Sequence, residues 1–158
     1  MQKSIEPHWL KPEVIIHSKL ILDTYYKIKG IPLFDLEDSD ARKAYLLYHA
    51  PFVVVSHGTE SDPIFNYAND TAQKLWNLDW EEFVKLPSRQ SAEPDRQEDR
   101  QRLLATAAEQ GYVDGYEGIR KSSDGKRFKI QNVLLWNLTD EDGKPLGQAA
   151  FYRNWTYL

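Results

Sequence analysis

Ser56, His57 and Asp62 are the residues whose types and order come closest to those of a nucleophilic catalyst. Such a catalyst needs a serine next to a histidine base, which a carboxylate orients. The run Phe52–Ser56 is rich in β-branched residues and predicts a buried strand. Adjacent side chains of a strand point to opposite faces, so Ser56 and His57 cannot form this pair. We therefore do not expect an enzyme.

Metal and cofactor chemistry is limited by the absence of cysteine. Disulfides, thiolate metal sites, iron–sulfur clusters and cysteine adducts of flavin are all excluded. His49, His57 and Asp62 match no familiar spacing of metal ligands, so we predict no metal site. No histidine follows Asn69 to serve as an axial haem ligand near the expected pocket. The sequence does not identify a cofactor, and both a noncovalently bound flavin and an apolar metabolite are compatible with it.

Two polar residues are candidates for ligand binding. Asn132 has inward parity in the predicted strand Arg127–Leu138, and a buried amide needs a ligand, a water or a backbone group as its partner. Arg89 lies in a loop, where it can grip an anionic ligand or tie the loop to a carboxylate such as Glu93. Both alternatives remain open for each residue, whereas Asn69 has the position of a structural helix cap.

The first fifty residues predict two helices. The segment Lys11–Gly30 has a proline suited to the first turn and a glycine suited to the C-terminal cap. Its wide apolar stripe must pack on the domain or on a partner subunit, and it comprises Val14, Ile15, Ile21, Leu22, Tyr25 and Ile28. Ser39 can cap a second helix that runs to about His49.

A second strand and three further helices follow the first strand. Ile64–Ala68 should form a hairpin with Phe52–Ser56, after which Asn69 caps a helix and Asp79 opens another through a capping box. The longest later helix is predicted over Arg96–Gln110. We expect its arginines to form ion pairs with acidic residues of the same segment; these residues are Arg96, Arg100 and Arg102 with Asp95, Glu98 and Asp99.

Three strands complete the chain, over Tyr112–Ser122, Arg127–Leu138 and Gly147–Tyr157. Asp-Gly pairs separate them, which is a strong hairpin signal, so we expect an antiparallel meander. In the middle strand the alternation predicts one inward-facing set, namely Phe128, Ile130, Leu134 and Trp136, with Asn132 on the same face.

Composition limits the partners and the location. The formal net charge of the 158 residues is -4, and no block of like charge stands out, so we expect no nucleic-acid partner. The N-terminus lacks the apolar core of a signal peptide, and no apolar run approaches the roughly 20 residues that cross a bilayer. We expect no membrane and a cytoplasmic location.

The order of elements predicts an α+β fold, with a PAS-like five-stranded antiparallel sheet, helices on one face and two N-terminal helices before it. Five runs carry a resemblance to one family: Val54–Gly58, Asp62–Asn69, Leu86–Pro94, Ser122–Phe128 and Gly147–Phe151. The chain resembles the MEKHLA domain, a PAS-related family found as standalone bacterial proteins and at the C-terminus of plant homeodomain leucine-zipper proteins. We expect residues 1–50 to be a helical extension and 51–158 the PAS-like domain.

The resemblance implies a sensory or regulatory module, and no homeodomain or zipper is present to carry over DNA binding. We expect a small molecule between sheet and helices, at a site that comprises Tyr67, Trp76, Phe83, Arg89, Asn132, Leu134 and Trp136. Because the last predicted strand ends beside Leu158, we expect the signal to leave through a partner or a homodimer formed by the first helix. The alternatives are a ligand-free interaction module and, third, a small enzyme.

Overall fold

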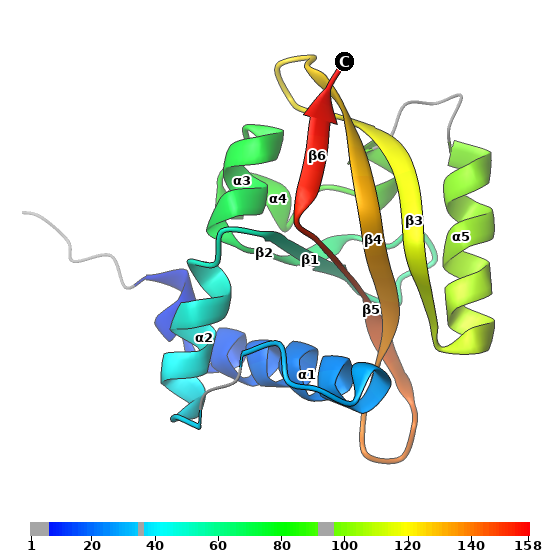
Figure 1. The fold of residues 1–158 in the computed structure, drawn as a ribbon. Helices are drawn as coiled ribbons and strands as arrows, with labels where there is room; N and C mark the ends of the chain where they lie inside the picture. The colour runs from blue at the N-terminus through cyan, green and yellow to red at the C-terminus, as the bar shows by residue number, and fades with distance from the viewer. Residues whose placement is uncertain (1–6, 35–36, 92–96) are drawn as a thin grey trace, which may run out of the picture.

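The computed structural model describes residues 7–34, 37–91 and 97–158. Its centre is an antiparallel sheet in the order β2-β1-β5-β4-β3 (Figure 1). The strands are β1 Val53–His57, β2 Phe65–Ala68, β3 Tyr112–Lys121, β4 Arg127–Thr139 and β5 Pro145–Tyr152. The expected five-stranded antiparallel sheet is confirmed. The predicted last strand is divided at Arg153, and its second part, β6 Asn154–Tyr157, pairs with β4 beyond the end of β5.

The N-terminal segment forms the short 3-10 helix η1 His8–Leu10, then α1 Pro12–Lys29 and α2 Asp40–Tyr48. Gly30 ends α1 at a φ of 75°, a left-handed conformation that glycine adopts without strain. The Ser39 hydroxyl accepts a hydrogen bond from the Arg42 backbone N–H and caps α2. Both helices predicted from the sequence are therefore confirmed, caps included.

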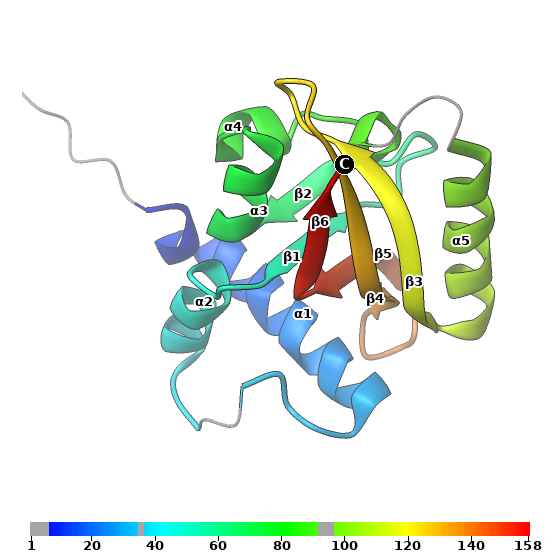
Figure 2. The ribbon, with the colours of Figure 1, turned by 45° about the horizontal axis from the view of Figure 1, so that its top comes forward.

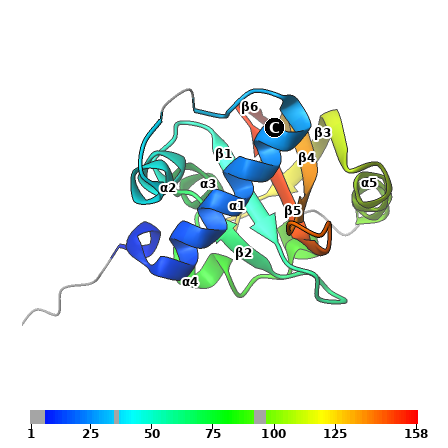
Figure 3. The same cartoon turned by 90° about the horizontal axis from the view of Figure 1, so that it is seen from below.

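Helix α1 lies across one face of the sheet, as Figure 3 shows from below. Ile21 and Tyr25 are buried in one apolar cluster with Leu134 and Trp136 of β4. The Trp136 indole N–H also donates to the Thr24 hydroxyl at 2.9 Å. The apolar stripe of α1 thus packs on its own domain. This was one of the two alternatives expected for it, the other being a partner subunit.

The opposite face carries the remaining helices, α3 Asp70–Trp76, α4 Trp80–Phe83 and α5 Gln97–Gln110, together with the 3-10 helix η2 Ser88–Ser91 (Figures 1 and 2). A second apolar cluster fills this side, and it comprises Val53, Val55, Phe65, Ala68, Ala72, Leu75, Trp76, Phe83, Phe128, Ile130, Val133 and Tyr152. The sheet therefore separates two cores. Helices cover both of its faces, because α1 takes the face that α3 to α5 leave open.

A bulge in β4 divides that strand into two segments of opposite parity. Gly118 pairs with Ile130 and Tyr116 pairs with Val133, so β4 has one residue more than β3 between these pairs. Asn132 lies in the bulge, at a φ of 54°, and its side chain is exposed. The prediction that Asn132 faces inward is therefore wrong.

The same bulge overturns the prediction of a single inward set. Phe128 and Ile130, before the bulge, face the cluster beneath α3 and α4. Leu134 and Trp136, after the bulge, face α1 on the other side. A strict alternation over the whole strand assigns both pairs to one face, and an inserted residue reverses the assignment for the second pair.

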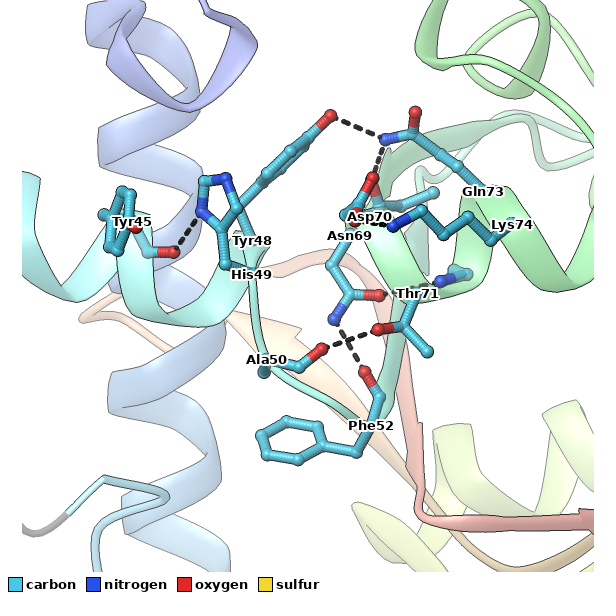
Figure 4. Close-up of polar contacts among 12 residues, drawn as sticks. Tyr45, Tyr48, His49, Ala50, Phe52, Asn69, Asp70, Thr71, Gln73 and Lys74 are labelled. Carbon is cyan, nitrogen blue, oxygen red and sulfur yellow. Dashed lines mark hydrogen bonds and ion pairs between the residues drawn. The ribbon is translucent and has the colours of Figure 1, made fainter.

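Asn69 connects three elements through one buried amide (Figure 4). Its oxygen accepts from the backbone N–H of Ala72 at 3.1 Å, which caps α3, and from that of Val54 at 3.2 Å, in β1. Its nitrogen donates to the carbonyl oxygens of Phe52 at 2.8 Å and Leu47 at 3.2 Å. The side chain is fully buried, so the predicted cap also joins α2, β1 and α3.

Two other residues of α3 extend this connection. The Thr71 hydroxyl donates to the Ala50 carbonyl oxygen at 2.6 Å, and the Gln73 amide donates to the Tyr48 hydroxyl at 2.9 Å (Figure 4). Hydrogen bonds from α3 therefore fix the segment that leads from α2 into β1.

We expect Asn69→Ala to lower the free energy of unfolding by about 3 kcal/mol, because it removes a helix cap and leaves buried backbone groups unpaired. Ser39→Ala is the matched control. It removes a cap that serves α2 alone, so its expected loss is about 1 kcal/mol. Chemical denaturation measures both values, and equal losses would show that the tertiary bonds of Asn69 do not contribute.

The bulge predicts opposite effects for two substitutions at Asn132. Asn132→Val should lower the free energy of unfolding by about 1–2 kcal/mol, because a β-branched residue is strained at positive φ. Asn132→Gly should leave the stability unchanged or raise it slightly. A residue in a regular strand would show the reverse order in chemical denaturation, with valine the more stable variant.

Candidate ligand-binding cavity

A cavity lies between the sheet and the helices α3, α5 and η2, with a volume of about 60 Å³. One water needs roughly 10–15 Å³ by the same measure, so the space exceeds that of a single water. Part of the wall is apolar and includes Val55, Leu103, Leu104, Ile130, Val133 and Leu135. The polar wall includes His57, Trp76, Ser88, Ser91, Arg100, Arg120, Gln148 and Tyr152. This mixed lining, between sheet and helices, is typical of small-molecule sites.

Arg100 of α5 is buried at the cavity, with 6% of its surface exposed. It donates a hydrogen bond to the Ser88 hydroxyl, and within the described ranges it forms no ion pair. Burial lowers the pKa of Arg100 to about 10, and the nearby positive charge of Arg120 acts in the same direction. A guanidinium in this setting is charged at neutral pH, and among the described residues no carboxylate forms an ion pair with it.

The prediction that Arg100 forms an intrahelical ion pair is wrong. Arg102 does pair with Asp99, while Arg96 and Asp95 lie outside the described residues. Arg100 instead shares a helical stripe with Leu103, Leu104 and Ala107, at spacings of three, four and seven residues, and this stripe faces the sheet. The stripe was the sequence signal that could have placed Arg100 inside.

Arg120 of β3 supplies the second guanidinium and is 8% exposed. Its Nη1 donates to the backbone oxygen of the preceding residue, Ile119, at 3.0 Å, and its charge lies 5.8 Å from the centre of the Tyr116 ring. Gly118 lies between them on the strand, and a Cβ there would come within 2.8 Å of Arg120 Nη1. The glycine therefore leaves the room that this arginine uses.

Three buried polar atoms of cavity-lining residues lack a hydrogen-bond partner in the part of the chain that the structure describes: His57 Nε2, Trp76 Nε1 and Tyr152 Oη. The His57 Nδ1–H donates to the Gly58 carbonyl oxygen at 3.0 Å, so Nε2 is an acceptor in the neutral ring. Burial lowers the pKa of His57, and the charge of Arg100 adds to this effect. Unpaired groups of this kind are rare in protein interiors and mark sites that a ligand can satisfy.

Among the site residues predicted from the sequence, Trp76 lines the cavity. Phe83 is buried in the apolar cluster on the same side, where its ring packs on that of Trp76. Tyr67, Leu134 and Trp136 lie on the α1 side of the sheet, away from the cavity. The structure thus brings together only part of the predicted set.

Arg89 and Asn132 also lie outside the cavity. The Arg89 side chain is 44% exposed, and its Nε donates to both carboxylate oxygens of Asp62, at 3.0 and 3.1 Å. Asp62 therefore provides the carboxylate expected for this arginine, while Glu93 lies outside the described residues. Arg89 was one of the two polar residues named as candidates for ligand binding, whereas Arg100 and Arg120 are the described arginines that line the cavity.

A second polar cluster involves Ser56 on the α1 side of the sheet. His17 Nε2 lies 2.8 Å from the Ser56 hydroxyl, which in turn donates to the Asn66 side-chain oxygen. The serine proton is therefore directed at Asn66, and His17 donates to the serine instead of accepting from it. Ser56 is 1% exposed, and His57 points to the cavity on the opposite face, as strand alternation predicted. This geometry does not activate a nucleophile.

The fold is that of a PAS domain. The PAS domain of a protein from Colwellia psychrerythraea has 18% sequence identity and a TM-score of 0.63, over 72% of this chain and 93% of that one. A structure described as an RNA-binding Light-Oxygen-Voltage receptor has 15% identity and a TM-score of 0.60, over 77% of this chain and 36% of that one. At these identities the likeness concerns the fold alone.

The chain belongs to the MEKHLA domain family, whose family model matches residues 15–157. Curated relatives include the homeobox-leucine zipper protein HOX10 of Oryza sativa, subspecies indica and japonica, each 20% identical over 93% of this chain. The chain spans 18% of the length of these relatives. The family match begins within α1, so most of the helix that covers the second face of the sheet lies inside the matched region.

The described residues also bear on membranes and metals. None of the helices in the described residues is long and apolar enough to span a bilayer. The same residues contain no group of three or more histidine, cysteine, aspartate or glutamate side chains with the geometry to hold a metal ion.

The partly buried His17 predicts a pH dependence of stability. Burial lowers the pKa of His17 to about 4, below its value in an unfolded chain, so the unfolded state binds the proton more strongly. Stability should therefore fall as the pH drops from about 6.5 toward 4. Between pH 7 and pH 5, wild type should lose about 2 kcal/mol more than His17→Gln in chemical denaturation. Equal losses would contradict a neutral, partly buried His17.

Proposed function

We propose that this protein is a sensory or regulatory module that binds a small molecule in the cavity between the sheet and helices α3 and α5. The observation that carries the proposal is a cavity whose wall holds three buried polar atoms that have no partner among the described residues. Most buried polar groups in protein interiors are hydrogen-bonded, so three unpaired ones around a single cavity indicate a missing partner. Membership of a PAS-related family and the PAS fold support the same function.

The sheet offers a direct route from the cavity to α1. On β1, His57 lines the cavity, and the preceding residue, Ser56, is within hydrogen-bond distance of His17 in α1. On β4, Leu135 lines the cavity while Trp136 donates to Thr24 of α1. A ligand that shifts β1 or β4 therefore changes how α1 packs on the sheet. The outer surface of α1 can then pass the signal to a partner.

The receiver of the signal is proposed to be a separate protein or a second copy of this chain. Most of the apolar stripe of α1 is used inside the domain, and Leu22 packs against the core. Ile16 and Tyr26 remain 70% and 55% exposed on α1, so a homodimer through this helix would use them. The cytoplasmic location and the absence of a nucleic-acid partner stay predictions from the sequence.

The proposal predicts a bound molecule on gently purified protein. Its mass under native conditions should exceed the denatured mass by one ligand, and Ala150→Leu should abolish the difference, because the added side chain fills the cavity. Ala108→Leu, the same change at an exposed position of α5, should retain it. Circular dichroism confirms that both variants fold.

Agreement of the native and denatured masses in wild type, with no response of the protein to added small molecules, would contradict the proposal. The ligand-free interaction module would then be the better description, and the native mass would show whether the chain associates with itself.

A further inference from the structure

The cavity wall carries an unbalanced positive charge. Arg100 and Arg120 both line it, and each guanidinium has five N–H donors but makes one hydrogen bond to a described residue. Among the described residues that line the cavity, none is an aspartate or a glutamate. The charge of Arg120 is close enough to lower the pKa of Arg100. Two like charges in a buried site repel each other, and each retains donors that need an acceptor.

The other polar groups of the wall add donors rather than negative charge. Trp76 Nε1 can only donate, and the Tyr152 hydroxyl can donate; both atoms are buried and unpartnered among the described residues. The Ser88 hydroxyl accepts from Arg100 and so holds that side chain in place against η2. The site thus presents preorganised donors and positive charge to whatever enters it, which is the complement of an oxyanion.

Size and apolar lining restrict the anion further. The volume of about 60 Å³ is several times the minimum for one water, so the cavity suits a small molecule and is too small for a flavin or a nucleotide in this conformation. Leu103, Ile130 and Val133 supply an apolar wall beside the arginines. A planar carboxylate matches the fork of a guanidinium, and a short hydrocarbon chain matches the apolar wall.

We infer that the cavity binds a short-chain organic carboxylate. Its carboxylate group lies between Arg100 and Arg120, and its hydrocarbon part lies against the apolar wall that includes Leu103. This inference rests on the proposed function, since it names the ligand class of the same site. The arginines act as binding residues. His57 Nε2, a hydrogen-bond acceptor in the neutral ring, suits a hydroxyl substituent on such an acid.

The test uses isobutyrate and isobutyramide, which have the same shape and differ in charge. The indole N–H signal of Trp76 reports on the cavity in nuclear magnetic resonance spectra, and Trp76→Phe assigns it among the five tryptophans. Isobutyrate should shift this signal in a saturable way. Isobutyramide should bind about 10-fold or more weakly, because it lacks the charge that the guanidinium groups require.

Arg100→Gln and Arg120→Gln should each weaken isobutyrate binding by about 10-fold or more. Arg102→Gln is the matched control, because it removes the same charge from an exposed position of α5 and should bind as wild type does. Arg100→Met is a control that separates loss of binding from loss of the fold. Without ligand it should have an unfolding temperature equal to or above that of wild type, because it replaces an unpaired buried charge with an apolar side chain.

Each outcome separates the two proposals. Equal binding of isobutyramide, or unchanged binding of isobutyrate by both arginine variants, overturns the carboxylate inference and leaves the small-molecule cavity standing. Inorganic phosphate is the third probe, and binding of phosphate without isobutyrate also overturns the inference in favour of a purely inorganic anion. If none of the three probes shifts Trp76 and the purified protein carries no ligand, both proposals fail.

Discussion

The side-chain amide of Asn69 is the interaction on which the arrangement of this domain depends. Its oxygen and nitrogen together make four hydrogen bonds. One reaches the carbonyl of Leu47 in α2, two reach Phe52 and Val54 at the start of β1, and one reaches the first turn of α3. A fully buried amide is tolerated only when its capacity is filled, as it is here. By joining β1 to α3, Asn69 fixes the positions of two cavity-lining residues, His57 of β1 and Trp76 of α3.

The bulge at Asn132 has a comparable effect on the other side of the molecule. One inserted residue lets β4 turn Phe128 and Ile130 toward the cavity helices and then Leu134 and Trp136 toward α1. A strand without the bulge would keep one parity along its whole length. The bulge therefore decides which residues of β4 enter each core, and α1 and the cavity lie on opposite faces of the same sheet.

Local signals in the sequence predicted the elements well. The caps at Gly30 and Ser39 and the Asp-Gly turns depend on neighbouring residues, so helix ends and hairpins could be located without tertiary information. The bulge could not be located in this way, because the positive φ of Asn132 follows from how β4 pairs with its partner strand and not from neighbouring residues. Arg100 was missed for a different reason. Acidic neighbours offered it local partners, and only the apolar stripe of α5 opposed that interpretation.

The two buried arginines also explain how such a site can act as a switch. An unpaired guanidinium in a protein interior costs folding free energy, since the charge has left water without gaining a counter-charge. An anion that enters the cavity removes this cost and binds only the folded state, so it stabilises the domain in proportion to its affinity. The stabilisation acts on η2, α5 and β3, the elements that hold Ser88, Arg100 and Arg120. Under the proposed function, ligand binding and the rigidity of this wall are therefore linked, and we expect a change in the wall to reach α1 through the sheet that both share.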